Sequence, residues 1–325
     1  MLRKKIVSTA LKSAPVRLTH TPGRPRSPQP TPDGKTVIFS SGTGEPDTRE
    51  LFSVDIEGQE QVQLTDRRVN LSHQAALSPD GSKIAYVVEK DRSSDLQVMN
   101  LDGSHNKNLT GNNKGFWNPT WSPDGESIVT VSRDTPKQNL ELVRVAANGA
   151  AKSLLTHLEY NLQNPVFAPG GEHIVFGLAP GTGAMILCSV RADGSGFKTY
   201  AEELSVSGKP DVSEDGTIAF CASGGRGRVS LYTAQLESDK PARKIHDSKL
   251  AGSPTFSPDG SKLAFIELDD DFNFQLRQIG VDGEKLETLS EPGTDNSDPV
   301  YTADGKQIIY VSGTFSDGEV YRQDL

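Results

Sequence analysis

The residue types that carry out most protein chemistry are present in this sequence, but their spacing forms no known reactive motif. None of the six histidines stands in a His-x-His or His-Glu-x-x-His pair, which would place two imidazoles on one metal ion. No serine lies in a Gly-x-Ser-x-Gly elbow, the turn that exposes a hydrolytic nucleophile. We therefore expect no catalytic residue, no metal and no cofactor, unless side chains from distant parts of the chain gather in space.

Three further groups suggest chemistry at first sight and have simpler interpretations. Asp269, Asp270 and Asp271 lack the spaced oxygen ligands and the glycine of a calcium loop, so they indicate a solvated loop. Residues 224–228 read Gly-Gly-Arg-Gly-Arg, and without a following helix or interleaved aromatics they indicate a loop tip rather than a phosphate contact. Cys188 and Cys221 lie in strand-like runs, where we expect buried free thiols.

The charge distribution argues against nucleic acid as a partner. The net charge is −9, but no acidic residue precedes Asp33, and seven basic residues do. From Asp33 onward 27 basic residues stand against 43 acidic ones, whereas phosphate binding needs a basic surface. No apolar run approaches the roughly 20 residues that span a bilayer. Residues 1–14 form a basic tail that lacks the long apolar core of a signal peptide, so we expect a cytoplasmic protein, with a periplasmic or organellar location left open.

The elements that must position any site follow from one repeated phrase. Trp121 precedes Ser122-Pro123-Asp124-Gly125, a tight-turn sequence, and related turns recur with their final glycines 47, 44, 46, 45, 44 and 45 residues apart. A period in the forties, filled with strand signals, indicates a propeller or an array. The seven closing glycines are Gly34, Gly81, Gly125, Gly171, Gly216, Gly260 and Gly305.

Each copy divides into four short strands, a to d. In the third copy these are residues 118–122, 127–131, 141–145 and 152–156, and strand d ends on a Leu-Thr pair. Strand b is apolar on consecutive residues in most copies, so both of its faces must be covered. Blades packed between two neighbours satisfy that requirement. The sequence therefore predicts an all-β, seven-bladed propeller of four-stranded antiparallel blades over residues 15–325.

The chain ends predict how the ring closes. The last copy stops at Leu325 after strand c, and residues 16–19, Val-Arg-Leu-Thr, match a strand d. Thr19 lies fourteen residues before Asp33, as Thr110 does before Asp124. We expect the N-terminal segment to supply the outer strand of the seventh blade, which removes an open sheet edge. The alternative is an open array, or six blades with one odd copy.

The Pro-Asp-Gly turn, the apolar strand after it and the Asp-Gly turn before a Leu-Thr pair resemble the WD-like repeats of the TolB-type propellers. This resemblance covers about residues 15–325 and implies the fold more than a function. It also extends to the propeller domains of prolyl-oligopeptidase-like enzymes, whose catalysis lies in a separate domain. It further extends to seven-bladed oligogalacturonide lyases, which bind a metal through clustered histidines. We find no matching cluster, although His20 and His73 could approach one another on one face.

The two faces of such a propeller differ in how much they vary. One carries the short repeated turns, and the other carries the d–a and b–c loops, which differ from copy to copy and suit a binding site. A column of polar residues precedes the prolines of strand a, and Trp117 stands before its strand without a counterpart in other copies. The predicted binding residues are Arg24, Arg26, His73, Gln74, Trp117, Asn118, Tyr160, Gln163, Asn164, Lys209, Asp295 and Asp298.

These features favour a rigid, non-catalytic scaffold that engages a protein or a peptide through the loop-rich face and the channel mouth. The alternative is an enzyme acting in the channel mouth, such as a sugar lyase or a hydrolase. That alternative requires a metal or a cluster of titratable groups in the channel.

Overall fold

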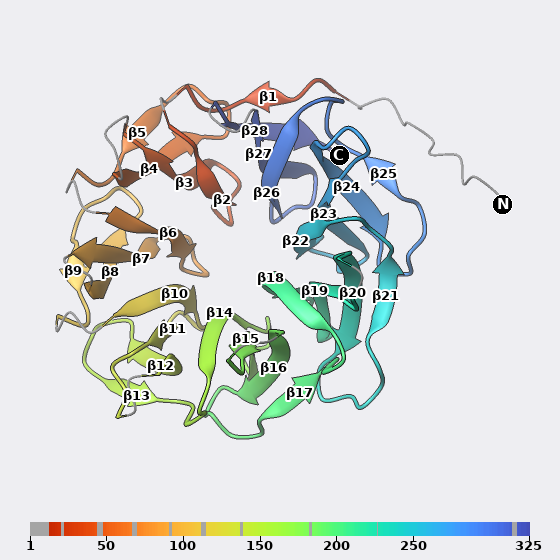
Figure 1. The fold of residues 1–325 in the computed structure, drawn as a ribbon. Helices are drawn as coiled ribbons and strands as arrows, with labels where there is room; N and C mark the ends of the chain where they lie inside the picture. Colours follow the sequence, from red (N-terminus) through yellow and green to blue (C-terminus); the bar gives the residue numbers. More distant parts are fainter. Residues whose placement is uncertain are drawn as a thin grey trace.

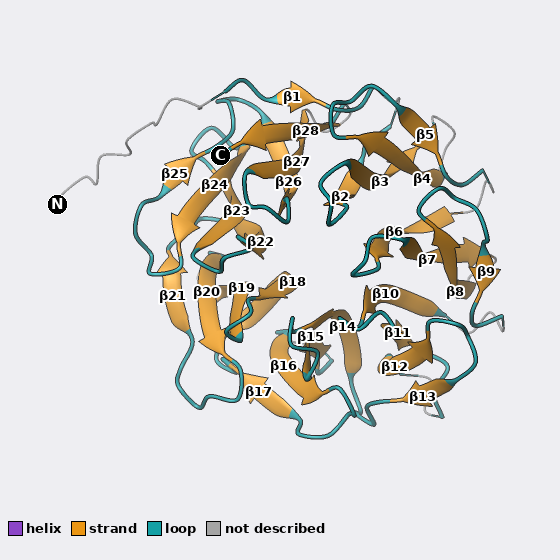
Figure 2. Ribbon diagram, turned by 180° about the vertical axis from the view of Figure 1, so that it is seen from behind, coloured by secondary structure: helices purple, strands orange, loops and turns teal. Residues whose placement is uncertain are grey.

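The computed structural model describes residues 13–20, 23–43, 48–66, 70–90, 93–111, 115–136, 139–181, 184–225, 227–313 and 317–325; the side chains of residues 70–74, 90 and 93 are not described. Seven blades surround a central axis, which confirms the predicted fold class (Figure 1). The strands within each blade pair antiparallel. Seen from behind, the described connections between the strands are loops and turns (Figure 2). Within these ranges, no helix has the length and apolar character needed to cross a membrane.

Each blade contributes one strand to each of four concentric positions, and the blades are numbered 1 to 7 around the ring. In that order the innermost strands, a, are β2 (Arg26–Pro30), β6 (Asn70–Leu77), β10 (Phe116–Trp121), β14 (Asn161–Phe167), β18 (Ser205–Val212), β22 (Ala251–Phe256) and β26 (Asp295–Tyr301). The b strands are β3 (Thr36–Gly42), β7 (Lys83–Lys90), β11 (Ser127–Ser132), β15 (His173–Ala179), β19 (Thr217–Ser223), β23 (Lys262–Leu268) and β27 (Gln307–Gly313).

The two outer positions hold the remaining strands in the same order. The c strands are β4 (Arg49–Asp55), β8 (Ser93–Asn100), β12 (Glu141–Ala146), β16 (Ile186–Arg191), β20 (Ser230–Gln235), β24 (Phe274–Gly280) and β28 (Glu319–Asp324). The outermost d strands are short: β5 (Gln61–Gln63), β9 (Lys107–Asn108), β13 (Lys152–Leu154), β17 (Lys198–Tyr200), β21 (Arg243–His246), β25 (Glu287–Thr288) and β1 (Val16–Arg17). One parallel bridge, between Arg49 and Asn70, also links blades 1 and 2.

The repeated turn owes its sequence to one hydrogen-bonding pattern. In six blades a Ser or Thr hydroxyl donates to the Asp carboxylate two residues later, at 2.5–2.7 Å. The same carboxylate accepts a backbone N–H at 2.9–3.1 Å, and the closing glycine has a φ of 67–79°. The hydroxyl donor is the largest cause that lowers the pKa of these six aspartates. Blade 4, with Ala168-Pro169-Gly170-Gly171, lacks this pair.

The Leu-Thr pairs at the ends of the d strands also have a structural cause. The Thr156 hydroxyl accepts the N–H of Leu142 at 3.0 Å and donates to the Glu141 carboxylate at 2.5 Å. Because the side chain of Thr156 takes over the pairing, β13 ends at Leu154, two residues earlier than the sequence predicted. Equivalent pairs hold a buried carboxylate in blades 1, 2 and 7, formed by Thr65 with Glu50, Thr110 with Asp95 and Thr19 with Glu319.

The hydrophobic core lies between the blades and uses alternate residues of strand b. On β11, Val129 and Val131 pack with Ile174 of blade 4, whereas Ile128 packs with Val87 of blade 2. All five of these side chains are at most 1% exposed. This packing explains why the b strands are apolar on both faces.

The ring closes as predicted, through the N-terminal segment. β1 pairs antiparallel with β28, with Val16 opposite Arg322 (Figure 1). Leu18 follows, 1% exposed, in a cluster with side chains of blades 1 and 7. The Thr19 hydroxyl accepts the N–H of Val320 at 2.9 Å and donates to Glu319. Closure therefore combines a strand pair, a buried side chain and a buried polar pair.

Candidate functional site

The innermost strand of each blade carries a bulge where it pairs with strand b. The pairing of strands a and b shifts register in all seven blades at this point. In five blades the residue before the proline has a φ of 49–55°, and in blade 5 Gly208 has a φ of 77°. A left-handed conformation costs a non-glycine residue about 1–3 kcal/mol, and its recurrence marks it as part of the fold. The five non-glycine residues are Ser27, Asn118, Asn164, Ser253 and Asp298.

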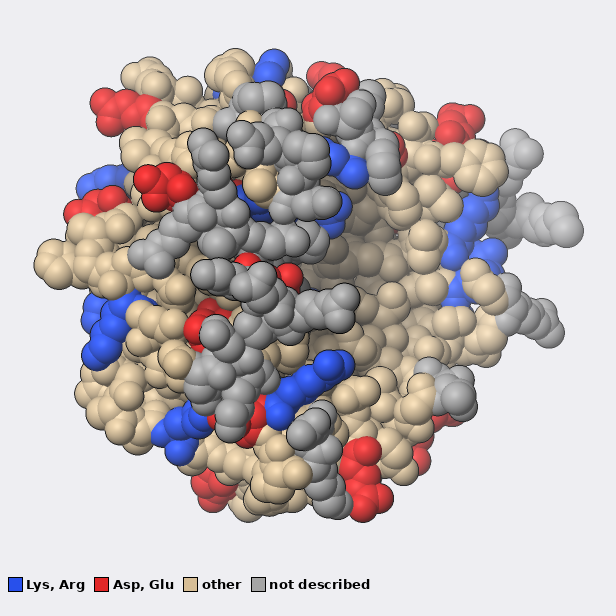
Figure 3. All heavy atoms as spheres, turned by 60° about the vertical axis from the view of Figure 1, so that its left-hand side comes forward, with Lys and Arg blue, Asp and Glu red and all other residues tan. Residues whose placement is uncertain are grey.

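Side chains at these bulges connect neighbouring blades around the centre. Asn118 donates to Asn164 at 3.2 Å, and Asn164 donates to the carbonyl of Gly208 at 3.3 Å. Asp298 of blade 7 accepts the backbone N–H of Ser27 in blade 1 at 3.1 Å. Polar groups at these bulges therefore join neighbouring blades at the innermost strands. The space-filling view shows the surface hollowed near its middle, with Lys and Arg side chains at several points around the hollow (Figure 3).

A pocket of about 310 Å³ opens between blades 7 and 1 on the loop-rich face. Arg24 and Arg26, at the start of blade 1, form one wall. Asp295 and Asp298, on the first strand of blade 7, form the other. These four predicted residues are far apart in the sequence and become neighbours because the ring closes. The pocket therefore has a cationic wall and an anionic wall.

Arg26 differs from the two aspartates in how far its charged group is already engaged. Asp298 accepts the N–H of Ser27, and Asp295 accepts the N–H of Phe274 at 3.0 Å. The guanidinium of Arg26 is exposed and makes no hydrogen bond or ion pair with any residue that the structure describes. The donors of the Arg26 guanidinium are therefore not taken up by the described residues.

Arg49 lies beside this pocket, and the sequence analysis did not identify it. It lies at the start of β4, and its guanidinium donates to the carbonyls of Arg24 and Ser40. Burial, and then the charges of Arg26 and Arg24, lower the pKa of Arg49 to about 10, against the opposing effect of Asp298. Three arginines within mutual electrostatic reach leave an excess of positive charge on the blade 1 wall, in an otherwise acidic protein.

The remaining predicted residues lie elsewhere. Trp117 is partly buried: its ring lies against Gly115, and the Arg133 guanidinium stands 5.7 Å from the ring centroid. Tyr160 is 46% exposed on the loop before β14, and Gln163 pairs opposite Gly177 within that blade. None of these three lines the pocket. The side chains of His73 and Gln74, the residues 1–12 of the basic tail and Arg226 of the glycine-rich loop lie outside the described residues.

Lys209 and a second charged residue, Asp211, form a pair on β18. Lys209 is exposed to solvent, yet the surrounding blades displace enough water to lower the pKa of its ammonium. Desolvation likewise raises the pKa of Asp211, although its carboxylate accepts the N–H of Phe256 at 2.8 Å. Neighbouring groups whose pKa values shift in opposite directions occur at sites of acid–base catalysis and also in structural ion pairs.

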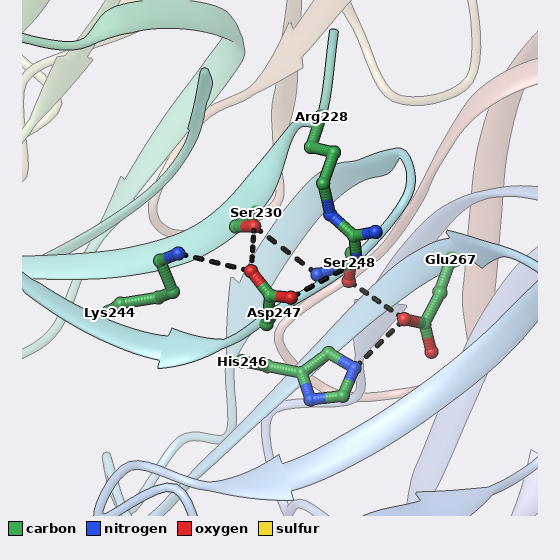
Figure 4. A network of polar contacts seen from close by, with 7 residues as sticks. All are labelled: Arg228, Ser230, Lys244, His246, Asp247, Ser248 and Glu267. Atoms are coloured by element: carbon green, nitrogen blue, oxygen red, sulfur yellow. Dashed lines mark hydrogen bonds and ion pairs between the residues drawn. The ribbon is translucent and has the colours of Figure 1, made fainter. Parts of the chain in front are cut away.

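A serine, a histidine and a glutamate also meet between blades 5 and 6, but not in the order of a hydrolytic triad (Figure 4). Both Ser248 and His246 contact the same oxygen of Glu267, each at 2.8 Å. The serine hydroxyl thus bonds the carboxylate directly, and Ser248 is only 1% exposed. Burial works against ionisation of Glu267, but His246, Ser248 and Arg277 outweigh it and lower its pKa. The network stabilises the blade interface and presents no nucleophile beside a base.

Two other groups resolve as structural features. The Asp269 carboxylate accepts the N–H groups of Asp271 and Asn273, each at 2.9 Å, and so organises its own exposed loop. Cys188 and Cys221 are buried free cysteines, and burial raises the pKa of each thiol to about 12. Among the described residues no three His, Cys, Asp or Glu side chains are grouped to hold a metal ion.

Fold and site together define a seven-bladed β-propeller with a charged pocket at the loop-rich mouth of its centre. Residues 3–203 match the TolB beta propeller domain family (PD40), and the chain belongs to that family. The Tol-Pal system protein TolB of Francisella tularensis subsp. tularensis is 26% identical over 234 residues, which are 70% of this chain and 52% of TolB. The uncharacterized peptidase YuxL of Bacillus subtilis is 25% identical over 194 residues, 58% of this chain and 28% of YuxL.

Among solved structures, an oligogalacturonate lyase from Vibrio parahaemolyticus has a TM-score of 0.75 and 17% identity, covering 95% of this chain and 92% of the lyase. At that identity the likeness concerns the fold alone. The chain spans about half of TolB and about a quarter of YuxL. None of these relatives supports the cytoplasmic location expected above, and the compartment stays a prediction.

Proposed function

We propose that this protein is a binding scaffold that takes a protein or peptide segment bearing a carboxylate at the loop-rich mouth, in the pocket between blades 7 and 1. The observation that carries the proposal is the exposed Arg26 guanidinium, unengaged by described residues, in a pocket with Arg24 beside it and Asp295 opposite. A guanidinium binds a carboxylate with two parallel hydrogen bonds. One oxygen of Asp295 is held by Phe274, which leaves the other to accept an N–H of the bound segment.

The size and position of the pocket suit a segment rather than a whole folded surface. A volume of about 310 Å³ is at the lower end of ligand pockets, enough for a few residues. The walls come from innermost strands that pack against neighbouring blades on both sides, so the backbone that carries the charged groups is held before the ligand arrives. Such preorganisation lowers the cost of binding.

The test is a selection of random heptapeptides, displayed once as internal segments and once with free C termini. We expect the native protein to enrich aspartate and glutamate in the first library or short C-terminal carboxylate motifs in the second. The two libraries thus separate the two sources of the carboxylate. For the selected peptide, Arg26→Ser is expected to weaken binding at least tenfold, because a charged hydrogen bond contributes about 1.5–3 kcal/mol.

The matched control is Arg133→Ser. Arg133 is an exposed arginine in a b–c loop of the same face, outside the pocket. Its loss should leave binding unchanged. Equal losses of affinity in the two variants would mean that general surface charge, and not the pocket, binds the peptide. A failure of both libraries to enrich any motif would contradict the proposed function.

The second candidate is an enzyme, a sugar lyase or hydrolase acting at the channel mouth, and the oppositely shifted pair Lys209 and Asp211 favours it. Measuring product release from oligogalacturonate separates the two candidates. The scaffold proposal predicts no turnover. Turnover that Lys209→Met abolishes, without a change in thermal stability, would favour the enzyme.

A further inference from the structure

A single aromatic side chain stands out on the loop-rich face. Phe272, between β23 and β24, is 80% exposed, more than any other large apolar residue described in the chain. Its φ of 65° is a left-handed conformation that a bulky residue adopts at a cost of about 1–3 kcal/mol. Both the exposure of the ring and the backbone conformation are unfavourable in the isolated protein.

The loop that carries Phe272 is held in place by its neighbours. Asp269 accepts the N–H groups of Asp271 and Asn273, and the N–H of Asp269 donates to the carbonyl of Asn273 at 2.9 Å. These hydrogen bonds involve the residues directly before and after Phe272. The loop therefore fixes the backbone from which the exposed ring extends.

A second loop fixes the position further and adds apolar surface. The N–H of Leu268 donates to the carbonyl of Leu250 at 2.9 Å, and Lys249 pairs with Asp270. Leu250 is itself 37% exposed. Two loops of one face thus bring two exposed apolar side chains into the same neighbourhood.

This neighbourhood adjoins the charged pocket. Phe274, two residues after Phe272, lines the pocket and donates its N–H to Asp295. The chain from Phe272 to Phe274 spans at most about 7 Å, a distance that about two residues of an extended bound peptide cover. A segment that extends about two residues beyond the pocket on this side can therefore reach Phe272.

We infer that Phe272, with Leu250, is an apolar anchor beside the pocket, and that the bound segment carries an aliphatic or aromatic side chain two or three residues from its carboxylate. This inference rests on the proposed function and specifies its ligand. The excess charge of the three arginines selects the carboxylate, and burial of the exposed ring selects the apolar neighbour. Aromatic residues that become fully desolvated are frequent centres of binding energy at interfaces.

The test repeats the heptapeptide selection on two variants. Phe272→Ser is expected to keep the enrichment of carboxylates and to lose the enrichment of apolar residues two or three positions away. We also expect Phe272→Ser to bind a synthetic peptide with the motif selected by the native protein at least tenfold more weakly, as measured by fluorescence polarisation. The matched control is Phe197→Ser, because Phe197 is also exposed, at 46%, but lies on the turn before β17, on the opposite face.

Each outcome separates this inference from the proposed function. A carboxylate motif without an apolar partner, or one that Phe272→Ser leaves unchanged, overturns the anchor and leaves the scaffold proposal standing. If Arg26→Ser leaves the binding of the selected motif unchanged, the scaffold proposal itself is overturned. If sedimentation shows that the native protein self-associates and that Phe272→Ser abolishes this, a second copy covers the ring and the anchor is again overturned.

Discussion

Replacing Leu18 with alanine is expected to lower the free energy of unfolding by about 2–5 kcal/mol. Leu18 is 1% exposed and packs between side chains of the first and last blades, including Phe39 and Ile309. Its backbone N–H also donates to the carbonyl of Val320 at 2.8 Å, so the surrounding chain cannot easily collapse into the space left by the removed atoms. Urea unfolding followed by circular dichroism measures the change. The control is Val62→Ala, a 51% exposed position on β5, which should cost little.

The polar part of the closure is tested with Thr19→Val. This change leaves the buried Glu319 carboxylate and the N–H of Val320 without the hydroxyl that pairs both, at a cost of about 1–3 kcal/mol. Thr65→Val removes the same contacts within blade 1 and serves as the matched variant. Hydrogen exchange should accelerate in blades 7 and 1 for the Thr19 variant. If Leu18→Ala costs no more than Val62→Ala, the N-terminal strand does not hold the ring closed.

Acid is expected to destabilise the folded protein. Hydroxyl and backbone donors lower the pKa of six turn aspartates, to about 2 for Asp80 and Asp259. The unfolded chain, with ordinary aspartate pKa values near 4, then binds more protons than the folded one. The stabilisation is complete above about pH 4 and is lost as the pH falls toward 2. Each turn contributes less than its full shift because water screens these surface groups.

The measurement is the free energy of unfolding at pH 7, 4 and 3. The double variant Asp80→Asn, Asp259→Asn should be less stable than the native protein at pH 7, and the difference should shrink from pH 4 to pH 3, because the unfolded chain already binds protons at these positions while the folded turns keep the aspartates ionised. Ser78→Ala should act in the same direction, because the Ser78 hydroxyl is the largest contributor at Asp80. Parallel pH curves for the native protein and the double variant would contradict this account.

The fold could be predicted because its determinants are local and repeated. The repeated turn needs a hydroxyl, a carboxylate and a glycine within four residues, as in Ser122, Asp124 and Gly125, so it can be recognised from the sequence. Seven copies fixed the number of blades. The closing strand was recognisable because Thr19 keeps the spacing of the other strand d threonines.

Residues of the candidate site could be predicted only where their position in the repeat places them in the pocket. Arg24, Arg26, Asp295 and Asp298 lie at the starts of the first and last innermost strands, which closure makes neighbours. Arg49 was missed because it belongs to strand c, and only tertiary packing shows that its side chain reaches Arg24. Phe272 was missed for a related reason: a phenylalanine in a short loop resembles a core residue until its exposure is known.

The pairing of β1 with β28 also determines when the ring can be completed during synthesis. Arg17 and Glu319, which bond each other in the finished ring, are 302 residues apart. A ribosome adding about 5–20 residues per second needs roughly 15–60 seconds to make the intervening chain. During that time β1 has no partner, and an unpaired strand edge favours association with other chains. The early blades can form while synthesis continues, but the ring is completed only after its last strand has been released, so we expect newly made chains to depend on protection of their first strand.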